Sequence, residues 1–193
     1  APTPLLHAAR DAAYVHGVDG FGDVAYDHPL RAAEREHAAL AILRLSHVHA
    51  GKLLLVALGP LTNLALALKL DPSLPSRVAR LVVMGGAVTA HGNITAAAEF
   101  NVAFDPEAAH IVFSSFPRTE LADWEAVMAH GFAHERFERW LQAPSPRARF
   151  YDTISRRTRD WAAARRGEDW HSADALAMAL ALHPEGALEM TER

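Results

Sequence analysis

Residues 81–113, LVVMGGAVTAHGNITAAAEFNVAFDPEAAHIVF, decide the predicted fold. They begin with four consecutive apolar residues that the pair Gly85-Gly86 interrupts, a pattern typical of a buried strand. They continue into Asp105, Pro106 and Glu107, which suit the N-cap, the first position and the positively polarised first turn of a helix. The segment therefore predicts a strand, a long polar loop and a helix in succession.

The loop between that strand and helix carries Asn93, Glu99 and Asn101. Ligands of open α/β sheets bind at the carboxyl ends of the strands, which is where this loop begins. Two amides and a carboxylate can hold vicinal hydroxyls, because each group accepts hydrogen bonds and the amides also donate them. The loop is thus a candidate sugar-binding site. The alternative interpretation is an asparagine turn and a surface acid.

Strands and helices alternate along the chain. Apolar runs predict strands at residues 52–58, 81–84 and 119–122. Helices are predicted at residues 31–48, 61–70, 106–114, 124–130, 134–141, 147–165 and 172–182. Residues 1–29, with several prolines and glycines, are expected to form a loop. The alternation predicts an α/β fold, an open and mostly parallel sheet flanked by helices, in one domain over residues 1–193.

Composition excludes several classes of protein. With 193 residues, of which 50% are apolar, the chain can bury the core of one ordinary domain. Its net charge of −4 gives no reason to expect nucleic acid or an anionic membrane as a partner. It has no cysteine, and no apolar run approaches the ~20 residues of a membrane helix. With no signal peptide visible, a cytoplasmic location is expected.

Several blocks of the sequence, in order, resemble the nucleoside hydrolase family, the inosine–uridine preferring N-ribohydrolases. They are VHGVDGFG at residues 15–22, VALGPLTNLALAL at 56–68, MGG with GNITAAAEFN and DPEAA at 84–109, and SADALAMALALHPE at 172–185. The resemblance implies a nucleoside hydrolase-like fold with a Rossmann-like core. It also implies Ca²⁺-assisted hydrolysis of ribonucleosides to ribose and free base, and assembly into a homodimer or homotetramer.

The resemblance implies a set of residues that bind the ribose or line its pocket. They are His16, Met84, Asn93, Glu99, Phe100 and Asn101. For two of them a simpler role is available. Met84 ends a buried strand, where core packing is the default. His16 lies in a glycine-rich stretch, where a histidine bonded to the backbone is the alternative interpretation.

Asp174 lies in the first turn of the last predicted helix, two residues after its expected cap, Ser172. The simpler interpretation is an acid that favours the helix dipole. The resemblance instead implies a ligand of both Ca²⁺ and ribose, with the backbone carbonyl of Leu58 as a second metal ligand. One subgroup has a histidine where this chain has Ala173, so the acid that protonates the leaving base is not identified. The pair Trp124-Glu125 is similar to a Trp–Glu pair of the animal-type branch.

The chain departs from the family at its N-terminal end. The family begins with an aspartate-rich segment, D-x-D-x-G-x-D-D, that supplies the general base and most calcium carboxylates, and this sequence contains no such run. An N-terminally truncated member without its general base is therefore expected. Two alternatives stay open: a catalytically incomplete domain that binds nucleoside or ribose, and a zinc protein that uses His130 and His134, which have helical i, i+4 spacing.

Overall fold

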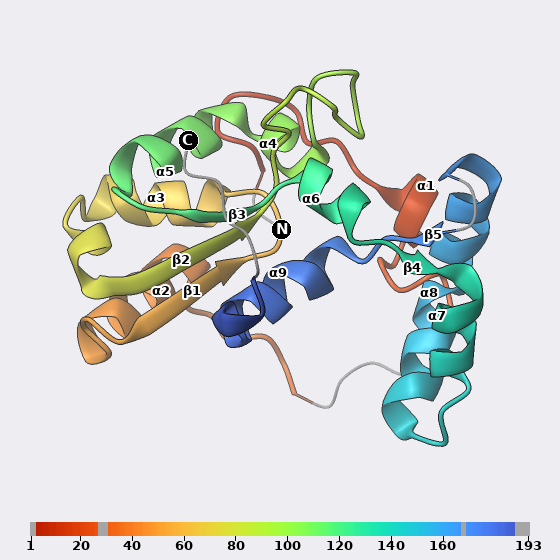
Figure 1. Ribbon diagram of the computed structural model, residues 1–193. Helices are drawn as coiled ribbons and strands as arrows, with labels where there is room; N and C mark the ends of the chain where they lie inside the picture. Colours follow the sequence, from red (N-terminus) through yellow and green to blue (C-terminus); the bar gives the residue numbers. More distant parts are fainter. Residues whose placement is uncertain (1–2, 27–30, 167–168, 188–193) are drawn as a thin grey trace. The chain divides into compact units, whose positions relative to one another are not determined.

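The structure, a computed structural model, describes residues 3–26, 31–166 and 169–187 (Figure 1). The chain divides into two compact units. The sheet unit comprises Ala1–Ala9, Glu34–Ala129 and Ser172–Arg193, and the helical unit comprises Arg10–Ala33 and His130–His171. The single domain predicted over residues 1–193 is not tested by this division and stays a prediction.

Three parallel strands form the centre of the sheet unit. They are β1 (Leu53–Ala57), β2 (Val78–Met84) and β3 (Glu120–Ala122), in the order β1-β2-β3. Ala57 pairs with Val83, and Met84 pairs with Ala122, so the strands end at the same edge of the sheet. The predicted parallel sheet is confirmed, with β2 longer at its start than the apolar run alone indicated.

Helices cover both faces of this sheet (Figure 1). One face is covered by α2 (Ala38–Val48), α3 (Thr62–Leu70) and α5 (Pro106–Ser115), and the other by α6 (Trp124–Ala129) and α9 (Ala173–Leu182). The side chains of β2 alternate between the two faces, as they must in a strand. Leu81 and Val83 pack with residues of α3 and α5, whereas Val82 and Met84 pack with Ala177 of α9. The predicted α/β class with flanking helices is confirmed.

Short elements complete the sheet unit: η1 (Leu74–Arg77), α4 (Phe100–Phe104) and η2 (Pro184–Gly186). The helix predicted at residues 31–48 begins only at Ala38, where His37 Nδ1 accepts a hydrogen bond from the Ala39 amide at 3.1 Å. The prediction was wrong for residues 31–37. These residues are exposed, so their helical turns would have no apolar surface to pack against.

The helical unit contains α1 (Ala13–His16), β4 (Phe132–Ala133), α7 (His134–Leu141), α8 (Pro146–Arg166) and β5 (Asp169–Trp170). β4 and β5 pair antiparallel, and Phe137 stacks on Trp170 with ring centroids 4.7 Å apart. The predicted loop over residues 1–29 is wrong at α1, because four residues are too few to show a helical period. No helix in the described ranges is long and apolar enough to cross a membrane.

Candidate functional site

The loops that follow the three parallel strands begin side by side at one edge of the sheet (Figure 1). Leu58 follows β1, Gly85 follows β2 and Asp123 follows β3. Five of the residues singled out from the sequence lie at the end of β2, in the loop after it or in the first turn of α4. They are Met84, Asn93, Glu99, Phe100 and Asn101.

Glu99 is a buried carboxylate at this edge, with only 2% of its surface exposed. It is the N-cap of α4, where Oε2 accepts hydrogen bonds from the Asn101 amide at 2.9 Å and the Val102 amide at 3.3 Å. The same oxygen accepts from the Gly86 amide at 2.9 Å. A Cβ at Gly85 would lie 3.3 Å from Oε2, so glycine allows this close approach. The hydrogen bonds from the described residues all end on Oε2, which leaves Oε1 for a ligand.

Asn101 is held against the end of β2. Its Nδ2 donates to the Met84 carbonyl at 3.2 Å and lies 3.2 Å from Met84 Sδ. Neither contact uses Oδ1, so this oxygen can accept from a ligand hydroxyl. Met84 itself is 3% exposed and packs in the core, as the simpler interpretation expected.

Asn93 has a structural contact of its own. Its Oδ1 accepts a hydrogen bond from the Phe100 backbone amide at 2.8 Å, and its backbone N–H donates to the Ala98 carbonyl at 3.1 Å. Asn93 therefore has a structural role, as the turn interpretation expected, because its side chain bonds to the first residue of α4. Its Nδ2 is a donor that neither of these contacts uses. The ring of Phe100 lies 6.0 Å from that of Phe104, centroid to centroid.

Asp174 lies in the first turn of α9, near the Glu99 carboxylate. The residue as a whole is exposed, but the surrounding protein partly desolvates its carboxylate. This desolvation, together with repulsion from Glu99, raises the pKa of Asp174. A cation or a hydroxyl donor near the two carboxylates would relieve this repulsion. Ala173 and Leu58 pack against the same core cluster as Met84, which fixes α9 and the end of β1 beside the loop.

His16 belongs to the helical unit, whereas the residues described above belong to the sheet unit. It ends α1 in the helical unit, where its carbonyl accepts from the Gly22 amide at 2.7 Å and burial lowers the pKa of its imidazole. Its assignment to the pocket stays a prediction.

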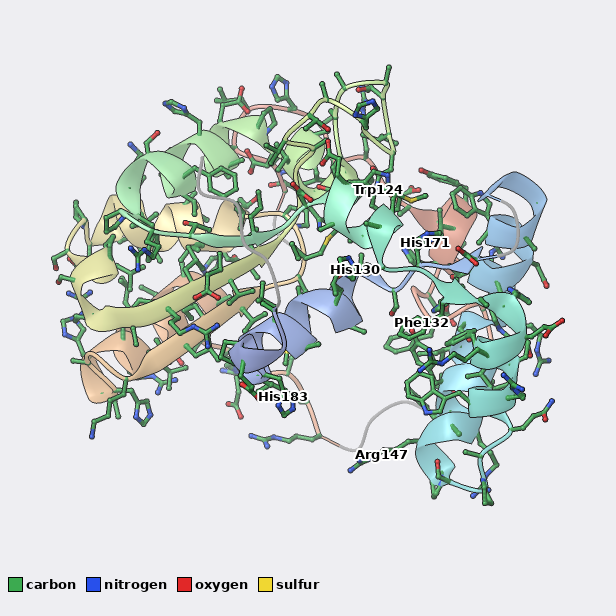
Figure 2. All side chains as sticks on the ribbon, in the orientation of Figure 1. Trp124, His130, Phe132, Arg147, His171 and His183 are labelled. Carbon is green, nitrogen blue, oxygen red and sulfur yellow. The ribbon has the colours of Figure 1, made fainter. Side chains whose placement is uncertain are left out.

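Glu125 is a residue whose role the sequence did not indicate. From α6, which begins at Trp124 (labelled in Figure 2), its carboxylate accepts four hydrogen bonds from the loop after β2. The donors are the amides of Val88 (3.1 Å), Thr89 (2.8 Å) and His91 (3.3 Å), and the Thr89 hydroxyl (2.8 Å). Desolvation opposes ionisation, but the bonds from Thr89 and His91 outweigh it and lower the pKa of Glu125 to about 2. In the sequence, the similarity of Trp124-Glu125 to a Trp–Glu pair of the family was the one feature that pointed to this residue.

Potential metal ligands are few. Within residues 3–26, 31–166 and 169–187, no group of three or more His, Cys, Asp or Glu side chains could hold a metal ion. His130 (labelled in Figure 2) and His134 belong to no such group, and His134 Nε2 lies 3.4 Å from Glu138 Oε1 instead. Asp174 and the carbonyl of Leu58 would be two of the six to eight oxygens, roughly, that Ca²⁺ takes.

Comparison with known proteins identifies the chain. The model of the inosine-uridine preferring nucleoside hydrolase family matches residues 1–192. The probable uridine nucleosidase 1 of Oryza sativa subsp. japonica is 36% identical over 179 residues, which cover 91% of this chain and 55% of that protein. The inosine-uridine preferring nucleoside hydrolase of Leishmania major is 42% identical over 113 residues, 58% of this chain and 36% of that protein.

Solved structures agree with this match. The plant nucleoside hydrolase PpNRh1 superposes with a TM-score of 0.87 at 27% identity, covering 91% of this chain and 56% of its own. An inosine-guanosine nucleoside hydrolase superposes with a TM-score of 0.85 at 31% identity, covering 98% and 61%. Where the match covers most of this chain, the chain spans about half the length of the related protein. Since the family model covers nearly every residue, the chain belongs to the inosine-uridine preferring nucleoside hydrolase family.

Proposed function

We propose that the chain forms the ribose-binding part of an enzyme that hydrolyses the N-glycosidic bond of ribonucleosides, giving ribose and free base. Family membership supports this activity. The observation that carries the proposal is the geometry of Glu99, whose Oε2 is fixed by three backbone amides at the carboxyl end of β2, with Asp174 near enough for the two charges to interact. Asn101 is held against Met84 at the same edge. Carboxylate and amide groups at one edge suit the vicinal hydroxyls of a pentose.

In this proposal the chain contributes positioning. Glu99 Oε1 and Asn101 Oδ1 accept from the sugar hydroxyls, and Asn93 Nδ2 donates to them. Met84 and Phe100 line the pocket, and the assignment of His16 to it stays a prediction. A ribose fixed in this way presents its anomeric carbon to water in a constant orientation, and such orientation lowers the barrier to bond cleavage. The proposal assigns no general base to this chain, because the carboxylates described here already have other roles.

Calcium is the metal that the proposal includes, with Asp174 and the Leu58 carbonyl as ligands. The described residues do not complete this site, since two oxygens are far fewer than the roughly six to eight that Ca²⁺ requires. The ion would need further ligands. The raised pKa of Asp174 is consistent with a carboxylate that lacks a nearby positive charge. Assembly into a dimer or tetramer and a cytoplasmic location stay predictions.

Calorimetry with uridine, inosine and free ribose tests the proposal. We expect all three to bind, because the contacts are to the sugar. Asn101→Leu keeps the volume of the side chain but removes its hydrogen bonds, and we expect it to weaken binding about tenfold. Gln142→Leu removes an exposed amide from the end of α7 and serves as the control. Equal binding by Asn101→Leu and the wild type would overturn the assignment.

The second candidate function is a domain that binds ribose or nucleoside without hydrolysing it. The absence of any cluster of three potential metal ligands among the described residues favours it. The same protein preparation distinguishes the two functions when uridine is incubated with it and free uracil is measured by chromatography. Binding with uracil release supports the hydrolase, and binding without release supports the second candidate.

A further inference from the structure

The loop after β2 is held at two separate places. Glu99 holds its root, through the Gly86 amide. Glu125 holds the part from Val88 to His91, through the four hydrogen bonds from α6. Asn93 lies two residues after His91, and its side chain contacts the start of α4. The position of Asn93 therefore depends on both carboxylates.

The part held by Glu125 contains a strained residue. Ala90 has φ of 61°, a left-handed conformation that residues with a Cβ seldom adopt. Its neighbours on both sides, Thr89 and His91, donate to Glu125 Oε1, at 2.8 Å and 3.3 Å from their amides. Strained backbone persists where surrounding contacts enforce it. The Glu125 carboxylate supplies such contacts on each side of Ala90.

Glu125 is itself firmly placed. It is the second residue of α6, whose start is fixed because the Trp124 amide donates to the Gly86 carbonyl at 2.9 Å. Asp123 Oδ1 also accepts from the Ala126 amide at 2.7 Å. Gly86 therefore contacts both carboxylate-bearing segments: its carbonyl accepts from the start of α6, and its amide donates to Glu99. The part from Val88 to His91 cannot move away from α6 without breaking the bonds to Glu125.

We propose that Glu125 is a positioning residue for sugar binding: it holds Val88–His91 in the strained conformation that places Asn93 at the site. The inference rests on the proposed function for its ligand, but the hold on the loop is a property of this chain alone. Four hydrogen bonds to the Glu125 carboxylate come from the loop, so its substitution should act through loop order.

Amide hydrogen exchange tests the hold directly. In Glu125→Ala the amides of Val88, Thr89 and His91 should exchange at least about tenfold faster, since each loses its acceptor. The amides of Gly86 and Asn101, which Glu99 holds, should keep their protection. Glu125→Gln retains the Oε1 acceptor and should lose protection mainly at Val88. Unchanged exchange at all three amides in Glu125→Ala would overturn the proposal.

Nucleoside affinity tests the consequence. We expect Glu125→Ala to weaken uridine binding about tenfold and Glu125→Gln to weaken it less. Glu185→Ala, an exposed glutamate beyond α9, is the control and should bind as the wild type does. In an Ala90→Gly background, where glycine adopts the left-handed conformation freely, Glu125→Ala should lose less affinity.

The two readouts separate the inference from the proposed function. Faster exchange with unchanged uridine affinity would show that the loop does not place a sugar ligand, and would overturn the positioning role. A wild-type protein that binds neither uridine nor ribose would refute the proposed function, while the exchange data would still decide whether Glu125 holds the loop.

Discussion

The ionised carboxylate of Asp174 is proposed to bind a metal ion, but its ionisation lowers the stability of the folded protein. Its pKa is raised by desolvation and by Glu99, so the folded state binds the proton more tightly than the unfolded chain does. Ionisation of this acid therefore costs stability at every pH above the raised pKa. The cost disappears below the ordinary pKa of an aspartate, where both states are protonated.

We expect Asp174→Asn to raise the melting temperature slightly at pH 7, because the amide removes this repulsion. The advantage over the wild type should shrink as the pH falls through the raised pKa towards about 4. Differential scanning calorimetry from pH 7 to pH 3.5 measures it. A variant that is less stable than the wild type at pH 7 would contradict the assignment.

Glu99 is expected to contribute to stability as well as to the site. Replacing it with glutamine either turns an NH₂ group towards the three backbone donors or leaves them a neutral amide oxygen, which is a weaker acceptor than a carboxylate oxygen. We expect Glu99→Gln to lower the free energy of unfolding by about 1–3 kcal/mol, measured by urea denaturation. Glu107→Gln, on α5, is the matched control. A loss of ligand binding with no loss of stability would show that the backbone contacts of Glu99 are weak.

At the scale of whole elements, α3 and α5 are joined by a buried polar contact. Asp105, fully buried, is the N-cap of α5 and accepts from the Ala108 amide at 3.0 Å. It also accepts from the Thr62 hydroxyl of α3 at 2.5 Å and from the Leu5 amide at 3.1 Å. One carboxylate thus satisfies donors from three segments of the chain, a role that the N-cap pattern alone did not reveal.

Removing this contact in two steps should give graded losses. Asp105→Ala leaves buried donors unpaired and is expected to cost about 2–4 kcal/mol, whereas Thr62→Val removes one donor and should cost about 1 kcal/mol. The double variant should lose little more than Asp105→Ala alone, because the two residues share an interaction. Chemical denaturation measures all three. Fully additive losses would argue against the direct bond.

α9 is joined to the sheet by Arg80. Its guanidinium forms a two-pronged pair with Glu120 of β3, at 2.8 and 2.7 Å, and its Nη1 donates to the Ala181 carbonyl at the end of α9 at 3.0 Å. We expect Arg80→Met to cost about 1–2 kcal/mol and to speed amide exchange in the last turn of α9. Arg80→Lys should recover part of the loss. Unchanged exchange there would show that apolar packing alone holds the helix.

The sequence predicted the elements better than their contacts. Residues 106–114 were found because Asp105 and Pro106 mark a helix start that depends on neighbours in the chain. α4 was missed, since five residues show no clear period and its cap, Glu99, is not a typical N-cap residue. Glu125 could not be assigned, because its partners are amides some 34 to 37 residues away. The nearness of Glu99 and Asp174 likewise depends on the docking of α9.

For the molecule as a whole, the edge of the sheet at β1 bears on assembly. Among the described residues β1 pairs only with β2, and its five apolar side chains are each only partly buried. Apolar edge strands without charged residues tend to associate. We expect the protein to associate with rising concentration and Leu54→Lys to reduce this, by sedimentation velocity. Leu70→Lys, at the exposed end of α3, is the control. Equal association of both variants would exclude β1 as the contact.

The place of α9 in the chain also matters while the protein is being made. A ribosome releases β1, β2 and β3 before α9, so Val82 and Met84 lack their partner Ala177 until late in synthesis. A nascent chain stalled before Ser172 would have α6 but not α9 on this face, so part of its apolar surface would be exposed to chaperones. Asp174 arrives with the helix that closes this face. Synthesis of α9 therefore adds both Asp174 to the candidate site and Ala177 to the core against Val82 and Met84.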